Sequence, residues 1–285
     1  MDWPDLSGIP MTAWLVWMAV MGLVIGSFLN VVIHRVPRML EQVWRQSALE
    51  ILHPEQASET ASRVESLAWP GSACPQCGHR LRAWENIPLL SFLWLRGACS
   101  QCTARISWQY PLVEGLTALL FVLALWHFGP NLTGLFALGF LAMLVALAGI
   151  DARTTLLPDS LTLPLLWAGL LANSLGLFTD LQSAVIGAMA GYLVLWTLYH
   201  VFRLLTGREG MGYGDFKLLA ALGAWLGWQA LPAVLVLAAG VGTIVGIVLI
   251  LRGRRRETPI PFGPYLAAAG ALALFAHEFA VGLYL

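Results

Sequence analysis

The chain has 285 residues, of which 58% are hydrophobic and only 11% are charged, and its formal net charge is zero. Soluble domains carry about 25% charged residues, so this composition excludes an ordinary soluble domain and favours a membrane protein. A nucleic-acid-binding protein needs a basic face. The sequence shows no such face, and we therefore expect no nucleic-acid partner.

Apolar runs long enough to cross a bilayer begin near the N-terminus. A spanning helix needs about 20 mostly apolar residues. The first run is followed by a polar stretch, and the remaining runs then succeed one another almost without pause. The eight runs are residues 11–33, 111–128, 132–150, 161–178, 181–202, 216–228, 229–251 and 262–283. The sequence thus predicts an all-α polytopic membrane protein with about eight transmembrane helices.

Two segments allow more than one interpretation. Residues 41–68 are polar, with apolar side chains at helical intervals, which is typical of an amphipathic helix on the membrane surface or of a solvated linker helix. Residues 216–251 have basic residues near both ends. Both ends must then lie on one side of the membrane, so this run must cross twice. We expect a break at 227–232, and the first leg could be a half-span.

The basic residues predict the orientation of the helices. All sixteen Lys and Arg fall in the polar stretch after the first run or in three later connectors, around Arg153, around 203–217 and at 252–256. Basic loops face the cytoplasm, so both termini are predicted to be periplasmic. This divides the chain into an N-terminus with the first helix (1–34), a cytoplasmic domain (35–109) and a multi-helix membrane domain (110–285).

Four cysteines form two CxxC pairs within the polar stretch. They are Cys74, Cys77, Cys99 and Cys102. Pairs at this spacing can place four thiolates tetrahedrally around Zn²⁺, and thiols stay reduced in the cytoplasm. We expect one zinc ion per chain. Because all four positions would be protein ligands, the role of the zinc would be structural. A redox CxxC pair or incidental cysteines are the alternatives.

Ionisable residues within membrane spans are costly and often functional. Four acids are predicted at the cytoplasmic face and two at the outer face: Asp151, Asp215, Asp159 and Glu114, and then Asp180 and Glu278. Asp215 ends a Gly-x-Gly-Asp run whose glycines allow irregular backbone. Asp151 lies at the same face two spans earlier. Two nearby carboxylates can share one proton, with one acting as acid and the other as base.

Simpler roles compete for each of these acids. Asp151 could pair with Arg153. Asp215 could be the N-cap of the next helix. Asp159, between Pro158 and Ser160, looks even more like an N-cap. The spacing of the residues leaves the catalytic and the structural interpretations open.

At these positions the sequence resembles the bacterial prepilin peptidases of type IV pilus and type II secretion systems. The resemblance covers nearly the whole chain and shows no departure at the motif positions. It lies in the two CxxC pairs, the Gly-x-Gly-Asp motif at 212–215, and the runs GSFLNVVIHR (26–35), ENIPLLS (85–91), ISWQYPLVE (106–114), LPD (157–159) and PFGP (261–264).

The resemblance implies an inner-membrane aspartyl protease with a small cytoplasmic zinc-binding domain between its first and second transmembrane helices. Its catalytic aspartates would be Asp151 and Asp215, and Asp159 would not be one of the pair. Such enzymes cleave the leader of a prepilin or pseudopilin after a glycine. They then methylate the new N-terminal residue with S-adenosylmethionine. The sequence has no GxGxxG-type cofactor loop, so methyl transfer rests on the resemblance alone.

Two alternatives remain at this point. One is a peptidase without methyltransferase activity. The other is a membrane transporter or assembly scaffold with a zinc ribbon, because acids within the membrane also mark ion pathways. Transport favours repeated segments and acids near the midplane. The acids here are predicted at one face, and the sequence shows no repeat by eye, which favours hydrolysis.

Overall fold

The computed structural model describes residues 10–52, 66–253 and 260–282, with side chains as far as residue 276. In these ranges the chain forms helices and no strand. It divides into two compact units, one made of Pro10–Val122 and the other built from Leu123 onward.

The first helix, α1 (Met11–Leu52), is a single element of 42 residues. At about 1.5 Å per residue it extends for about 63 Å, roughly twice the thickness of the hydrocarbon core. The predicted first span and the helical part of 41–52 are thus one continuous helix rather than two elements. Pro37 removes one backbone donor but does not end the helix. Residues 53–65 of the predicted segment lie outside the described residues.

Helix α4 (Gln109–Phe128) crosses α1 closely because glycines face it. A Cβ atom at Gly22 would lie 2.5 Å from the Cα of Ala118, and one at Gly26 would lie 2.7 Å from the Cα of Glu114. Small residues permit this approach between membrane helices. One turn further along α1, the Nδ2 of buried Asn30 donates a hydrogen bond of 3.1 Å to the carbonyl of Tyr110. Between these two helices, the chain forms the 3₁₀ helix η1 (Ala83–Asn86) and the short helix α3 (Leu90–Trp94).

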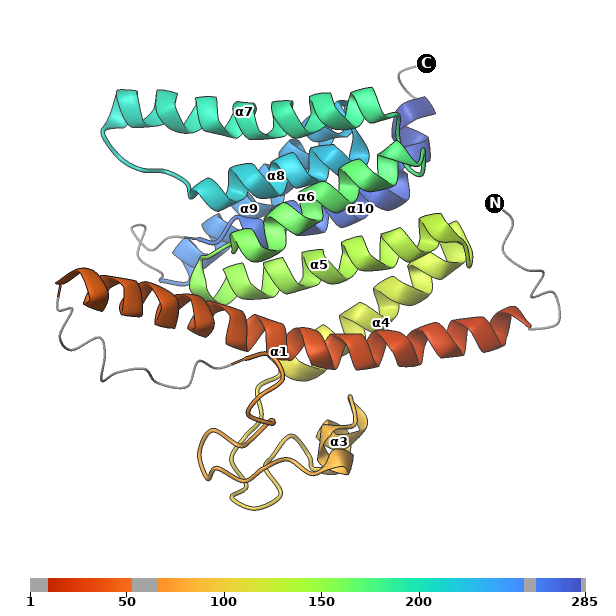
Figure 1. Ribbon diagram of the computed structural model, residues 1–285, viewed down its shortest axis with the longest axis vertical. Helices are drawn as coiled ribbons and strands as arrows, with labels where there is room; N and C mark the ends of the chain where they lie inside the picture. The colour runs from red at the N-terminus through yellow and green to blue at the C-terminus, as the bar shows by residue number, and fades with distance from the viewer. Residues whose placement is uncertain (1–9, 53–65, 254–259, 283–285) are drawn as a thin grey trace. The chain divides into compact units, whose positions relative to one another are not determined.

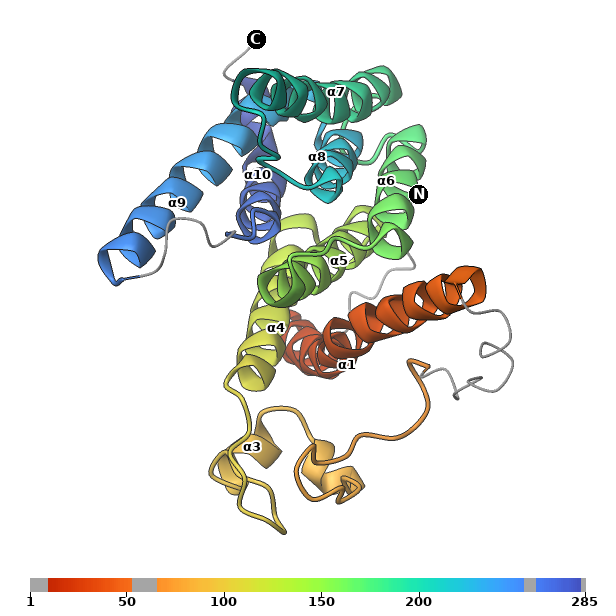
Figure 2. The same cartoon turned by 90° about the vertical axis from the view of Figure 1, so that its left-hand side faces the viewer.

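The second unit is a bundle around a short central helix. Its helices are α5 (Leu132–Thr154), α6 (Asp159–Ser174), α7 (Leu181–Thr206), α8 (Tyr213–Leu226), η2 (Trp228–Ala230), α9 (Leu231–Leu251) and α10 (Gly263–Gly282). Helix α8 packs against α6, α7 and α10 (Figure 1, Figure 2). Almost all of its residues from Asp215 to Leu226 are buried.

The positions of the helices agree with the apolar runs of the sequence. Each of the eight predicted runs overlaps one of the helices α1 and α4 to α10. Five described segments are long and apolar enough to cross a membrane: Met11–Leu52, Gln109–Phe128, Leu132–Thr154, Leu181–Thr206 and Trp228–Leu251. The predicted break in 216–251 is confirmed, because α8 ends at Leu226 and Gly227 adopts a φ of +78°.

Close glycine contacts hold α8 against α7. A Cβ atom at Gly223 would lie 2.1 Å from the carbonyl oxygen of Gly187, and one at Gly187 would lie 2.4 Å from the carbonyl oxygen of Gly223. One turn away, a Cβ atom at Gly191 would lie 2.6 Å from the carbonyl oxygen of Leu219. No larger residue fits these positions unless the two backbones move apart.

Polar groups fix the other side of α8. The indole Nε1 of buried Trp225 donates to the carbonyl of Leu165 at 2.7 Å, and its ring lies over Gly169 of α6. The Nδ2 of buried Asn173 donates to the carbonyl of Ala224 at 2.7 Å. The Oδ1 of Asn173 accepts from two backbone N–H groups of the loop after α6. Backbone groups at membrane depth need such partners, so Asn173 supplies acceptors and donors where α8 stops.

We expect Gly223→Ala to destabilise the protein, because its methyl group would collide with the backbone of α7. Overpacking of this kind costs about 1–3 kcal/mol, which should appear as a lowered unfolding temperature of the purified protein in detergent. Gly240→Ala in α9 is the matched control, because a Cβ atom there meets nothing within 4 Å. Equal unfolding temperatures for the two variants would contradict this account of α7–α8 packing.

Candidate active site and metal-binding module

Asp151 lies one turn before the end of α5 and is only 4% exposed. Its Oδ2 accepts a hydrogen bond of 2.8 Å from the backbone N–H of Gly263, the first residue of α10. The first N–H groups of a helix have no partner within it and favour a negative charge nearby. A Cβ atom at Gly263 would lie 2.7 Å from Oδ2. Glycine therefore allows the start of α10 to approach the carboxylate.

Asp215 lies in the first turn of α8 and is 8% exposed. The N-cap position of this helix is occupied by Gly212, so the interpretation of Asp215 as the N-cap residue is wrong. Gly214 packs against Leu157 from the loop between α5 and α6, where a Cβ atom would lie 2.7 Å from the Leu157 Cβ. Gly214 thus lets the start of α8 approach the α5–α6 loop.

The two aspartates lie in the same unit. The charge of Asp151 acts on the carboxylate of Asp215. Both side chains are largely removed from solvent, and the partner found for Asp151 is a backbone N–H rather than a basic side chain. A pair of this kind can hold one proton between two carboxyl groups, which is the equipment of general acid–base catalysis.

Asp159 does not join this pair. It is the first residue of α6, after an N-cap at Pro158, so its predicted role as an N-cap is also wrong. Its two oxygens lie 2.6 and 2.7 Å from the Nζ of Lys217 in α8. The side chain of Asp159 is 57% exposed. This ion pair ties the start of α6 to the start of α8, two residues beyond Asp215.

Glu114 belongs to the other unit. It is buried in the second turn of α4 beside Gly26 of α1. Its Oε2 accepts a hydrogen bond of 2.8 Å from the backbone N–H of Leu89, which has a φ of +56°. The carboxylate therefore fastens the loop between the two CxxC pairs to the membrane helix α4.

The two CxxC pairs form knuckles with the same hydrogen-bond pattern, offset by 25 residues. In the first, the N–H of Cys74 donates to the carbonyl of His79 at 2.9 Å, and that of Gly78 donates to Cys74 at 3.0 Å. In the second, Cys99 donates to Ala104 at 2.9 Å, and Thr103 donates to Cys99 at 3.1 Å. Gly78 and Thr103 both have positive φ, at 71° and 56°. This structural repeat was not visible in the sequence because a glycine and a threonine occupy the equivalent turn position.

The four sulfur atoms of these knuckles form one cluster. The Sγ atoms of Cys74 and Cys102 are 3.7 Å apart, and those of Cys77 and Cys99 are 3.9 Å apart. All four ligand atoms lie within 4.8 Å of one another. Tetrahedral coordination with Zn–S bonds of about 2.3 Å requires S···S distances of about 3.8 Å. The four-cysteine cluster could therefore hold a metal ion.

Backbone donors favour the thiolate form that a metal requires. The N–H groups of Cys77 and Gln76 lower the pKa of the Cys74 thiol to about 6. In the second knuckle, the N–H groups of Cys102 and Gln101 lower the pKa of the Cys99 thiol. A thiolate is the form that binds metals, so both knuckles are suited to coordination through their first cysteine.

Glu85 connects the two knuckles, and its side chain is only 2% exposed. Its oxygens accept from the Ser100 hydroxyl and from the backbone N–H of Arg82 at 2.7 Å, and the Nε2 of His79 lies 3.1 Å away. His79 follows the first knuckle, and Ser100 lies within the second. The Arg82 N–H and the Ser100 hydroxyl lower the pKa of Glu85 to about 2, so the carboxylate stays ionised at neutral pH.

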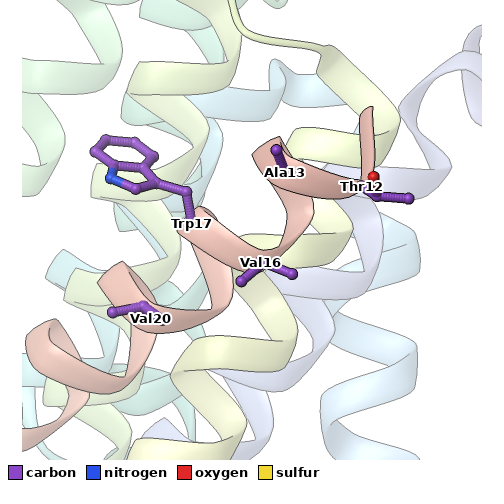
Figure 3. Close-up of a pocket in the computed structure, with 5 residues that line it drawn as sticks. All are labelled: Thr12, Ala13, Val16, Trp17 and Val20. Atoms are coloured by element: carbon purple, nitrogen blue, oxygen red, sulfur yellow. The ribbon is translucent and has the colours of Figure 1, made fainter. Parts of the chain in front are cut away.

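A shallow pocket lies on α1, and none of these acids lines it. It is lined by Thr12, Ala13, Val16, Trp17 and Val20 from the first turns of the helix (Figure 3). Val16, Trp17 and Val20 are at least half exposed, as expected for side chains that face lipid. The pocket contains no ionisable side chain.

Two protein-family models and several known proteins match most of the chain. Residues 20–128 match the bacterial peptidase A24 N-terminal domain, and residues 138–247 match the type IV leader peptidase family. A relative from Aeromonas hydrophila named "Prepilin leader peptidase/N-methyltransferase" is 60% identical over 253 residues, covering 88% of this chain and 87% of the relative. Relatives of the same name from Burkholderia pseudomallei (strain 1026b) and Pseudomonas aeruginosa are 52% and 53% identical, cover 94% and 89% of this chain, and are each covered to 87%.

The chain therefore belongs to the type IV leader peptidase family of membrane peptidases. The resemblance inferred from the sequence motifs is confirmed. No solved structure matches the chain.

Three residues with clear roles were not singled out by sequence reasoning. Gly263 was part of a recognised motif, but only the structure relates it to Asp151. Lys217 was counted as a basic residue of a loop, and its pairing with Asp159 depends on the packing of α6 on α8. Glu85 was likewise part of a motif. The only signal in the sequence was its position as the single acid among the residues between the two CxxC pairs.

We expect Glu85→Gln to weaken metal retention in the four-cysteine cluster. The amide keeps one acceptor oxygen but turns an NH₂ group towards groups that donate to the carboxylate, so the two knuckles should separate more easily. Loss of a supporting partner around a metal site costs about 10–100-fold in affinity. The measurement is the rate at which a chelator removes metal from the purified protein.

Glu50→Gln, at an exposed position near the end of α1, is the matched control and should behave as the parent. Cys74→Ser should lose the metal outright. An unchanged release rate for Glu85→Gln would show that the knuckles hold together without this carboxylate.

Proposed function

We propose that the chain is a prepilin leader peptidase and N-methyltransferase of the bacterial inner membrane. It cleaves the leader of type IV prepilins and pseudopilins after a glycine and methylates the new N-terminal residue. The proposal is carried by the pair of Asp151 and Asp215, which are both buried, lie on different helices of one unit, and include a charge at Asp151 that acts on Asp215. The names of the relatives support both activities.

A pair of carboxyl groups that share one proton can catalyse peptide hydrolysis. One aspartate, ionised, takes a proton from the attacking water, while the other, protonated, polarises the scissile carbonyl and later protonates the leaving amine. The N–H of Gly263 stabilises the charge on Asp151 and fixes the orientation of its carboxylate. The pair requires no basic side chain.

The four cysteines bind one structural zinc ion per chain. Cys74, Cys77, Cys99 and Cys102 would occupy all four tetrahedral positions, which leaves none for water. The zinc would hold the two knuckles together and would take no part in hydrolysis. S-adenosylmethionine would supply the methyl group, and we assign no residue to its binding.

The orientation follows from the basic residues. Eight crossings by α1 and α4 to α10 place both termini in the periplasm and the cysteine module in the cytoplasm. A prepilin leader is basic and cytoplasmic, whereas the segment after it is apolar and lies in the bilayer. The scissile bond then lies at the cytoplasmic interface, where the starts of α6 and α8 and the end of α5 are also placed.

Asp151→Asn and Asp215→Asn should each abolish prepilin cleavage almost completely and leave the fold intact, because the amide is nearly isosteric but cannot exchange the proton. The double variant should be no worse than either single one, since residues that act as a unit fail together. The measurement is the cleavage rate of purified protein in detergent, with product masses recorded with and without S-adenosylmethionine.

Asp159→Asn is the matched control for this experiment. It removes one partner of an ion pair whose acid is more than half exposed. Such pairs contribute only about 0–1 kcal/mol, so cleavage should fall far less.

Methylation of an already cleaved pilin should persist in the Asp151→Asn and Asp215→Asn variants if it uses a separate site. If either Asp→Asn variant was folded and cleaved prepilin near the parental rate, the two-aspartate mechanism would be refuted.

Reporter fusions should verify the orientation. A fusion after Gly253, which follows α9, should report a cytoplasmic location, and one after Asn131, the N-cap of α5, should report a periplasmic one. The reason is the arginine cluster at 252–256, which resists translocation. A periplasmic signal at Gly253 would mean that α8 and α9 together cross only once.

A further inference from the structure

The short helix α3 presents apolar side chains that no part of the described chain covers. Leu90, Leu93 and Trp94 are 61%, 71% and 82% exposed. They lie on a helix of five residues in the cysteine module, defined here as residues 66–108. Large apolar side chains gathered in this way on a polar module mark a surface that contacts another phase or partner.

The position of α3 relative to α4 indicates that α3 lies beside the membrane rather than in bulk water. Leu89, the residue before α3, is bonded to Glu114, five residues into the membrane helix α4. At about 1.5 Å per residue, this is a rise of about 7.5 Å from Gln109. The headgroup layer on each side of a bilayer is about 5–8 Å thick. The start of α3 therefore lies at the depth of that layer if α4 begins at the membrane surface.

A second exposed apolar stripe begins near α3, at the start of α4. The rings of Phe92 in α3 and Trp108, just before α4, lie 5.0 Å apart. Trp108 is itself 75% exposed, and along α4 it is followed at helical spacing by Leu112, Leu116 and Leu119, at 63%, 41% and 55%. This stripe lies on the side of α4 away from the residues that contact α1. In a membrane helix such a stripe faces lipid.

The charge of the cysteine module also favours contact with a membrane. Its four basic residues are Arg80, Arg82, Arg96 and Arg105, and all four are exposed. Its single acid, Glu85, is buried. The module therefore presents a positive surface, and basic residues near anionic lipids strengthen membrane binding.

We propose that the exposed face of α3, together with the start of α4, is a lipid-contacting surface that rests the cysteine module on the bilayer. Leu90, Leu93 and Trp94 enter the acyl layer, and the arginines of the module meet anionic headgroups. Trp and Leu flanked by basic residues are the composition expected at a membrane interface. This role is independent of whether the chain cleaves prepilin.

The test is photo-cross-linking of the full chain reconstituted in vesicles of phosphatidylethanolamine and phosphatidylglycerol. The vesicles would contain a small fraction of phospholipid with a diazirine in its acyl chain. Trypsin releases α3 in peptide 83–96, and the neighbouring peptide 97–105, which carries the second knuckle, is the internal control. We expect several-fold more lipid adducts on 83–96 than on 97–105.

A pair of double variants sharpens the test. Leu93→Glu with Trp94→Glu should reduce adducts on 83–96 to the level of 97–105, whereas Leu93→Met with Trp94→Phe should keep them. Metal content shows whether each variant module has folded. If the charged variant fails to fold, the comparison of lipid adducts on 83–96 and 97–105 in the parent and in the conservative variant still tests the proposal.

Two outcomes would overturn the proposal. Equal labelling of the two peptides in the parent protein would show that α3 lies in water. Adducts on 83–96 that disappear when prepilin is added at saturation would instead assign this face to the substrate. Neither outcome depends on catalysis, so the Asp151→Asn protein can be used throughout, which separates this result from the proposed peptidase activity.

Discussion

Glycine contacts between α7 and α8 set the position of one helix on which the proposed active site depends. Helix α8 has only 14 residues, about 21 Å at 1.5 Å per residue, which is shorter than the bilayer core. It avoids a mismatch with lipid because α6, α7 and α10 surround it. Association of helices in a membrane relies on close packing rather than on the hydrophobic effect, and Gly187, Gly191 and Gly223 provide that packing.

The consequences for Asp215 follow from this packing. Because its far end is fixed by hydrogen bonds of Asn173 and Trp225, α8 cannot slide along its axis without breaking buried hydrogen bonds. Its first turn, with Asp215, is therefore held in one position. Lys217 and Asp159 tie the same turn to α6, and Leu157 fills the space beside Gly214. The depth of the carboxylate is thus set by contacts at both ends of a short helix.

Much of this arrangement could be predicted from the sequence, and the reasons for the exceptions are physical. Hydrophobic runs locate the helices because a bilayer demands a minimum apolar length, and the break at Gly227 followed from charge at both ends of 216–251. Asp151 at the end of α5 and Asp215 at the start of α8 were located from the ends of the apolar runs and the positions of the basic loops. The length of α1 was underestimated because its polar second half has no apolar run. The partners Gly263 and Lys217 lie 112 and 58 residues from the acids they contact, and no local pattern encodes such distances.

Three buried carboxylates each accept a hydrogen bond from a backbone N–H group. Gly263 donates to Asp151, Leu89 donates to Glu114, and Arg82 donates through its backbone to Glu85. A backbone N–H stabilises a carboxylate without introducing a counter-charge. For Glu114 and Glu85 this fixes loops of the cysteine module. For Asp151 the same kind of contact has a different consequence in the proposed pair: an Arg or Lys partner would keep the carboxylate ionised, whereas a single N–H would leave it able to exchange a proton with Asp215. Gly263 would thus orient one acid of the proposed pair and still let it change its protonation state.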